Sequence, residues 1–85
     1  MQIKCVVIDD EPYAVQLIKD YIQKFPELIL LRTFDDGLAA VEFLGKTPVD
    51  LLFLDINMPD ISGIELLQSL KIKPMAILSA MRYEV

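Results

Sequence analysis

The chain has 85 residues, a formal net charge of −5 and 54% hydrophobic residues. This length permits one small domain, and such a domain buries only a modest fraction of its surface. The hydrophobic content is high for that size. We therefore expect a sheet whose apolar faces are well covered within this chain, or one that is covered by a part that this chain lacks. The acidic balance argues against nucleic-acid binding by this segment, because such binding depends on basic side chains that neutralise phosphates.

The sequence also constrains the cellular location. The single cysteine, Cys5, cannot form an internal disulfide and lies in an apolar run, so we expect a buried, reduced thiol in a cytoplasmic protein. No apolar stretch reaches about 18 residues, so no membrane span is expected. The N-terminus does not have the pattern of a signal peptide.

The first part of the chain predicts a strand, a helix and a second strand. Residues 2–8 are rich in β-branched residues and predict the first strand. The helix is expected to begin at Pro12, which suits the first helical position, and to end before Pro26. Residues 28–33 are too short for a helix and predict the second strand. The apolar stripe of the helix recurs at spacings of three and four residues and comprises Ala14, Leu17, Ile18, Tyr21, Ile22 and Phe25.

A second helix and a buried strand follow. Asp35 is expected to cap this helix, with Asp36 in its first turn, and Gly45 is expected to end it. Residues 51–55 then form an apolar run that stops at Asp55 and is followed by turn residues. A run of this kind is typical of a strand that is buried on both faces.

The last part predicts a third helix and a fourth strand. Ser62 and Glu65 have the spacing of a capping box, and the helix is expected to end near Lys71 and Lys73. Residues 75–79 are short and apolar and predict the last strand. The resulting βαβαβαβ order predicts an α/β fold with a doubly wound parallel sheet and helices on both faces.

The predicted topology brings acidic residues together. In the strand order 2-1-3-4, the first and third strands are neighbours, and their carboxyl ends meet where the winding reverses. Asp9, Asp10 and Asp55 then converge, with Glu11 close by. Carboxylates packed in this way repel one another unless a cation neutralises them, and Mg²⁺ prefers such oxygen ligands. The cluster therefore predicts a Mg²⁺ site at which a carboxylate attacks a phosphoryl group.

Two motifs resemble the receiver domain of bacterial two-component response regulators. The first is Val-Ile-Asp-Asp-Glu-Pro at residues 7–12, and the second runs from Leu-Phe-Leu-Asp-Ile-Asn-Met-Pro to the glycine at residues 52–63. The proline after Asp-Asp-Glu is most similar to receivers of the LytTR type. The resemblance implies the flavodoxin-like (CheY-like) fold with strand order 2-1-3-4.

The resemblance also implies a role for each matched residue. Asp55 matches the aspartate that accepts the phosphoryl group. Asp10 matches the acid that binds Mg²⁺ directly, and Asp9 matches the acid that holds it through water. Asn57 matches the residue whose backbone carbonyl completes the metal ligands. Ser79 matches the switch hydroxyl that turns toward the phosphoryl group.

Other positions match the surroundings of the site. Ala80 matches the small residue that leaves access to the acceptor, and Pro59 and Gly63 match residues that shape the turn after it. Three large side chains near the predicted site are assigned to packing rather than to a partner surface: Tyr13, Met58 and Met81.

A complete receiver of this kind continues beyond the last strand predicted here, through a helix, a fifth strand and a fifth helix. We therefore expect residues 1–85 to be a single, C-terminally truncated receiver domain without the family's output face, aromatic switch residue and phosphoryl-contacting lysine. Lys71 and Lys73 precede the last strand and cannot supply that lysine. The bared edge of residues 75–79 invites pairing, so a homodimer or an exchange of elements between chains is expected.

Three classes of function remain open. The first is a cytoplasmic receiver that takes a phosphoryl group from a sensor histidine kinase onto Asp55, turns over no external substrate, and regulates transcription through a DNA-binding domain outside this chain. The second is a phosphatase with an aspartyl nucleophile, which is disfavoured because Asn57 stands where those enzymes place a second acid. The third is a pseudo-receiver or fragment that only binds metal or partners; the motifs disfavour it for the parent protein, and the missing lysine keeps it open for this 85-residue chain.

Overall fold

A computed structural model of the chain describes residues 1–58, 61–71 and 74–79. The described elements, in chain order, are β1 (Ile3–Ile8), α1 (Pro12–Gln23), β2 (Leu28–Phe34), α2 (Gly37–Leu44), β3 (Leu51–Asp55), α3 (Gly63–Ser69) and β4 (Met75–Ser79). The strands form one parallel sheet in the order β2-β1-β3-β4. The predicted α/β fold and its strand order are confirmed.

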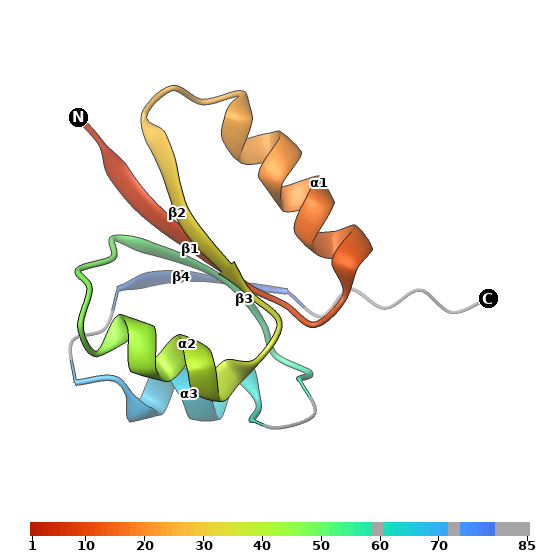
Figure 1. The fold of residues 1–85 in the computed structure, drawn as a ribbon, viewed down its shortest axis with the longest axis vertical. Coiled ribbons are helices and arrows are strands. Elements are labelled where there is room, and N and C mark those ends of the chain that lie inside the picture. Colours follow the sequence, from red (N-terminus) through yellow and green to blue (C-terminus); the bar gives the residue numbers. More distant parts are fainter. Residues whose placement is uncertain (59–60, 72–73, 80–85) are drawn as a thin grey trace.

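Helices cover both faces of the sheet (Figure 1), with α1 on one face and α2 and α3 on the other. The side chains of β1 alternate between the two faces. Cys5 and Val7 pack on the α1 side, Val6 and Ile8 pack on the side of α2 and α3, and all four are fully buried. Burial on both faces explains why this strand is a continuous apolar run rather than an alternating one.

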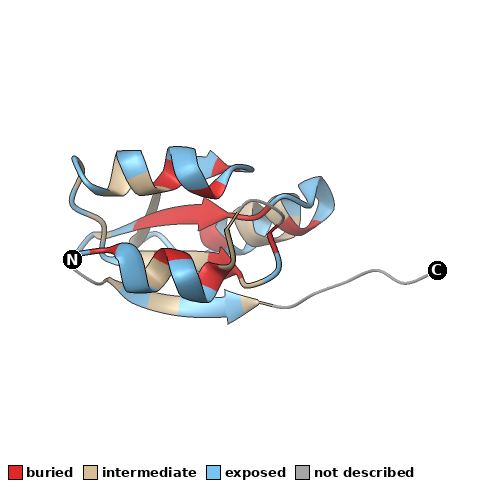
Figure 2. Ribbon diagram, turned by 90° about the horizontal axis from the view of Figure 1, so that it is seen from below, coloured by how far each residue is buried: buried red, intermediate tan, exposed pale blue. Residues whose placement is uncertain are grey.

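The outer edge of the sheet at β4 is apolar and exposed. Met75, Ile77 and Leu78 are 74%, 51% and 45% exposed, and Figure 2 shows the contrast with the buried central strands. Within the described residues, β4 pairs with β3 alone. The structure therefore has the bare, uncharged strand that the sequence predicted.

Helix α1 begins as predicted, but its apolar stripe differs. Glu11 caps the helix, and its side chain accepts a hydrogen bond from the Tyr13 N–H at 3.2 Å. Tyr21 is 64% exposed, because it lies beside the line of buried positions that runs through Ile22. Phe25 lies beyond the helix and is 48% exposed. Pro26 disfavours helical geometry at the residue before it, Phe25, so the helix ends before this residue.

Within the described residues, no helix is long and apolar enough to cross a membrane.

The cap of α2 is Asp36, so the prediction of Asp35 was wrong. The Asp36 backbone is extended, and its Oδ1 accepts a hydrogen bond from the Leu38 N–H at 2.9 Å. The shift has a simple cause: β2 runs one residue further than predicted, to Phe34, so Asp35 is taken up by the turn. The helix ends at Gly45, as predicted.

Helix α3 has the predicted capping box but is shorter than expected. The Ser62 Oγ accepts a hydrogen bond from the Glu65 N–H at 3.1 Å, and the Glu65 Oε1 accepts one from the Ser62 N–H at 3.4 Å. The next residue after the helix, Leu70, is extended and 8% exposed, because its side chain turns into the core. Lys71 therefore lies outside the last turn, and Lys73 lies outside the described residues.

Candidate metal centre

The two central strands end in acids at the same edge of the sheet. Ile8 of β1 lies in register with Leu54 of β3, so the residues that follow them are neighbours. The N–H of Asp9 donates to the Phe34 carbonyl of β2 at 2.9 Å, which extends the β1–β2 ladder by one residue. Asp55 is the last residue of β3. The sheet itself therefore fixes the backbone of both acids.

The acids form a compact cluster. Asp9, Asp10 and Asp55 each place a carboxylate oxygen within 4.8 Å of the others. Asp9 and Asp55 are 4% and 7% exposed, whereas Asp10 lies on the surface. The cluster therefore combines two buried carboxylates with one that solvent can reach.

Backbone donors orient both buried carboxylates in the same way. The Glu11 N–H donates to the Asp9 Oδ1, and the Asn57 N–H donates to the Asp55 Oδ1, each at 2.9 Å. These are local turns in which an aspartate side chain binds the backbone two residues further on. As a result, the two oxygens of Asp55 are not equivalent. These two hydrogen bonds were not predicted from the sequence. The signal for them is an aspartate at the end of a strand with a loop directly after it, because such an aspartate often accepts a hydrogen bond from the N–H two residues further on.

The charges of the cluster have no cationic partner in the part of the chain that the structure describes. Among the described lysines and arginines, none forms an ion pair with these three carboxylates. The pKa of Asp9 is raised to about 6, mainly by burial and also by the charges of Asp55 and Asp10, while the hydrogen bond from Glu11 lowers it. The pKa of Asp10 is also raised, first by its partial burial and then by Asp55. A bound cation would favour the ionised form of both carboxylates and so lower both pKa values.

The donor set fits a hard divalent ion. Mg²⁺ takes oxygen ligands at about 2.1 Å, so opposite ligands lie about 4.2 Å apart, and it usually keeps several waters. Three carboxylate oxygens spread over at most 4.8 Å reach this geometry with a small closure or with one water in between. The residues present therefore fit Mg²⁺ with carboxylate ligands.

The other predicted site residues lie around this cluster. Ser79 of β4 is in register with Asp55, and its carbonyl accepts a hydrogen bond from the Ile56 N–H at 2.9 Å. Asn57 is exposed next to the cluster. Lys71 lies before the start of β4, whereas Asp55 lies beside the last residue of that strand. This lysine is therefore at the opposite end of the strands from Asp55.

The packing predictions have mixed outcomes. Met58 is 6% exposed and belongs to the core, as predicted. Tyr13 is 57% exposed, so it does not belong to the buried core, although the next residue of the same helical turn, Ala14, is 1% exposed. Pro59, Ala80 and Met81 lie outside the described residues.

A groove of about 380 Å³ adjoins the cluster, which the sequence did not indicate. It lies between α1 and the end of β2, so its lining comes from segments that are separate in the chain. It is lined by Asp9, Asp10, Pro12, Val15, Gln16, Lys19, Thr33, Phe34 and Asp35. Two of the three acids of the cluster, Asp9 and Asp10, therefore border a surface depression.

Comparisons with known proteins agree with this geometry. The family model of the response regulator receiver domain matches residues 5–81. The transcriptional regulatory protein YpdB of Escherichia coli is 37% identical over 67 residues, which are 79% of this chain and 28% of that protein. Protein MrkE of Klebsiella pneumoniae is 35% identical over 69 residues, which are 81% of this chain and 26% of that protein. The chain thus spans little more than a quarter of the length of these relatives.

Solved structures of receiver domains share the fold. The response regulator domain of Thermotoga maritima CheB has a TM-score of 0.81 and 32% identity, over 92% of this chain and 60% of that one. The response regulatory domain of MrkE from Klebsiella pneumoniae has a TM-score of 0.80 and 32% identity, over 89% of this chain and 65% of that one. The two motifs, the strand order and the acidic strand ends therefore have one explanation: the chain belongs to the response regulator receiver domain family.

Proposed function

We propose that this chain accepts a phosphoryl group on Asp55 from a phosphohistidine of a sensor kinase, in a reaction that requires Mg²⁺. The observation that carries the proposal is the position of the buried Asp55 carboxylate within 4.8 Å of the carboxylates of Asp9 and Asp10. An anionic phosphoryl group cannot approach such a cluster until a cation neutralises it. Membership of the receiver family supports the same conclusion.

The proposed ligand set uses the acids and one backbone group. Asp10 and Asp55 would bind Mg²⁺ through carboxylate oxygens, Asp9 through a water, and Asn57 through its carbonyl. When bound, Mg²⁺ would neutralise the carboxylates and stabilise charge on the transferring phosphoryl oxygens. The exposed position of Asp10 and Asn57 beside two buried acids agrees with this division of roles.

In the proposed step, an oxygen of Asp55 forms a new bond to phosphorus while the bond from phosphorus to the donor imidazole nitrogen breaks. The imidazole nitrogen keeps the electron pair, and the product on the chain is an acyl phosphate. The Asn57 N–H holds the Asp55 Oδ1 in place, so the carboxylate does not have to be ordered during the reaction. Ser79 lies in register beside Asp55, and its hydroxyl is the proposed contact of the phosphoryl group.

The chain is its own phosphoryl acceptor in this proposal and does not turn over an external substrate. We place it in the cytoplasm with its kinase, and we assign it to the LytTR type with transcription as the output of a DNA-binding domain outside this chain. The name of its relative YpdB, a transcriptional regulatory protein, supports this output.

A second candidate is a metal-binding and pairing module that accepts no phosphoryl group. Lys71, at the opposite end of the strands, cannot contact a group on Asp55, and the exposed apolar edge of β4 is suited to pairing. The two candidates share the metal centre and differ in the chemistry of Asp55.

The test is phosphoryl uptake from acetyl phosphate by the 85-residue chain, followed by intact mass with Mg²⁺ and with EDTA. We expect one phosphoryl group per chain with Mg²⁺, little with EDTA, and none in the Asp55→Asn variant. Uptake that does not depend on Mg²⁺ or on Asp55 would contradict the proposal. Bound Mg²⁺ without uptake would favour the second candidate.

A further inference from the structure

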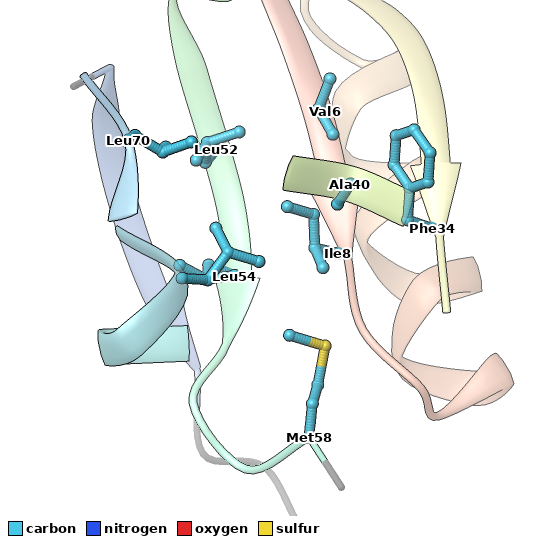
Figure 3. Packing of buried hydrophobic residues seen from close by; sticks show 9 residues of the cluster. Val6, Ile8, Phe34, Ala40, Leu52, Leu54, Met58 and Leu70 are labelled. Carbon is cyan, nitrogen blue, oxygen red and sulfur yellow. The ribbon is translucent and has the colours of Figure 1, made fainter. Parts of the chain in front are cut away.

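The loop that follows Asp55 is fixed to the core by the side chain of Met58. This side chain is 6% exposed and belongs to the core cluster on the α2 and α3 side. Figure 3 shows it pointing from the loop back into the protein, toward Ile8 of β1 and Leu54 of β3. Its neighbour Asn57 is exposed, so the loop passes from surface to core within one residue.

The same loop is fixed at its other end by close contact with Gly63. A Cβ at this position would lie 2.5 Å from the Asp55 carbonyl oxygen and 2.9 Å from the Ile56 Cα, both of which are backbone atoms. The Gly63 N–H also donates to the Ile56 carbonyl at 3.3 Å. The first residue of α3 therefore rests directly on the backbone of the acceptor aspartate, and only glycine permits this approach.

These two anchors act on the groups that would bind metal. The Asn57 N–H donates to the Asp55 Oδ1 at 2.9 Å, so the orientation of the carboxylate depends on where the backbone of Asn57 lies. Asn57 lies between Ile56, which contacts Gly63, and Met58, which is held in the core. We propose that Met58 and Gly63 are positioning residues, which set the Asp55 carboxylate and the Asn57 backbone for metal binding and phosphoryl transfer. This inference rests on the proposed function.

The first test compares Met58→Ala with Met58→Leu, using Leu70→Ala as the matched control. Leu70 belongs to the same core cluster and is 8% exposed, but it lies beyond the far end of α3. We expect Met58→Ala to lower the affinity for Mg²⁺ roughly tenfold, the size of effect seen when the support of a metal ligand is lost. Met58→Leu should restore the affinity, and Leu70→Ala should leave it unchanged. Calorimetric titration with Mg²⁺ measures the affinity, and the uptake rate from acetyl phosphate at saturating Mg²⁺ gives a second readout.

The second test compares Gly63→Ala with Gly45→Ala. A Cβ at Gly45 would meet only two carbonyl oxygens at 3.5 Å, an ordinary contact, so this variant controls for the loss of a glycine. We expect Gly63→Ala to weaken Mg²⁺ binding and to slow phosphoryl uptake, and Gly45→Ala to change neither.

The outcomes separate this inference from the proposed function. If the wild-type chain binds no Mg²⁺ and takes up no phosphoryl group, the proposed function fails. If the wild-type chain does both, and Met58→Ala and Gly63→Ala bind Mg²⁺ as tightly as the wild type, only the positioning inference is overturned. It is also overturned if Leu70→Ala weakens Mg²⁺ binding as much as Met58→Ala, because the effect would then be one of stability alone.

Discussion

At the scale of single residues, Asp9 carries an electrostatic cost in the metal-free protein. Burial, together with the charges of the neighbouring carboxylates, raises its pKa from the usual 3.8 to about 6. The folded protein thus binds this proton more tightly than the unfolded chain does. The associated stability is fully present below about pH 4 and is lost as the pH rises through about 6.

We therefore predict that Asp9→Asn stabilises the metal-free protein at neutral pH. Asparagine keeps an oxygen that can accept the Glu11 N–H but carries no charge. Urea unfolding in EDTA from pH 4 to 8 should show a gap between variant and wild type that opens as the pH rises toward about 6 and then stays constant. A gap that is independent of pH would contradict the proposed origin of the effect.

The same substitution should weaken the response to metal. A ligand that binds only the folded state stabilises it by RT ln(1 + c/Kd), where c is the free ligand concentration, so at a given concentration a weaker ligand stabilises it less. We expect Mg²⁺ to raise the midpoint of thermal unfolding of the wild type at pH 7, and to raise that of Asp9→Asn less. Equal shifts in both proteins would show that Asp9 does not belong to the metal site.

The sequence predicted the placement of the acids because that placement depends on topology alone. Asp9 and Asp55 each follow a buried strand, and neighbouring parallel strands end at the same edge of the sheet. The packing of Met58 was also predicted, but the close contact of Gly63 with the Asp55 backbone depends on how α3 sits against the end of β3, which no local pattern specifies. For the same reason the groove between α1 and β2 was not predicted.

At the scale of the elements, α3 is short and depends on its cap. Its seven residues begin with the reciprocal hydrogen bonds of Ser62 and Glu65. We predict that Ser62→Ala lowers the free energy of unfolding by about 1 kcal/mol, since an unfilled helix cap costs that much. Gln68→Ala, an exposed change on the same helix, should cost much less. Urea unfolding compares the two, and equal losses would contradict the role of the cap.

Element ends were harder to predict than element types. All of the predicted strands and helices exist, because apolar runs and periodic stripes extend over many residues. Each boundary, in contrast, depends on one or two residues, and the length of a neighbouring strand or the burial of one side chain can move it. The longer β2 moved the cap from Asp35 to Asp36, and the burial of Leu70 ended α3 before Lys71.

At the scale of the whole molecule, the open edge of β4 predicts self-association of the 85-residue chain. The strand Met75–Ser79 has no charge, and natural edge strands usually carry charges that prevent such pairing. We expect the average mass in sedimentation equilibrium to rise with concentration. Ile77→Lys should suppress this rise, whereas Ile64→Lys should not, although Ile64 is similarly exposed on α3. A monomer at high concentration would contradict the prediction.

The most direct test of the account is to locate the phosphoryl group. The chain is incubated with Mg²⁺ and acetyl phosphate, then treated with borohydride, which reduces an aspartyl phosphate to homoserine, and digested for peptide mass analysis. We predict homoserine at position 55 and unchanged aspartates at positions 9 and 10, because Asp55 is the acid that lies in register with Ser79, the proposed contact of the phosphoryl group. Homoserine at Asp9 or Asp10, or at no position while Mg²⁺ is bound, would contradict the assignment of Asp55 as the acceptor.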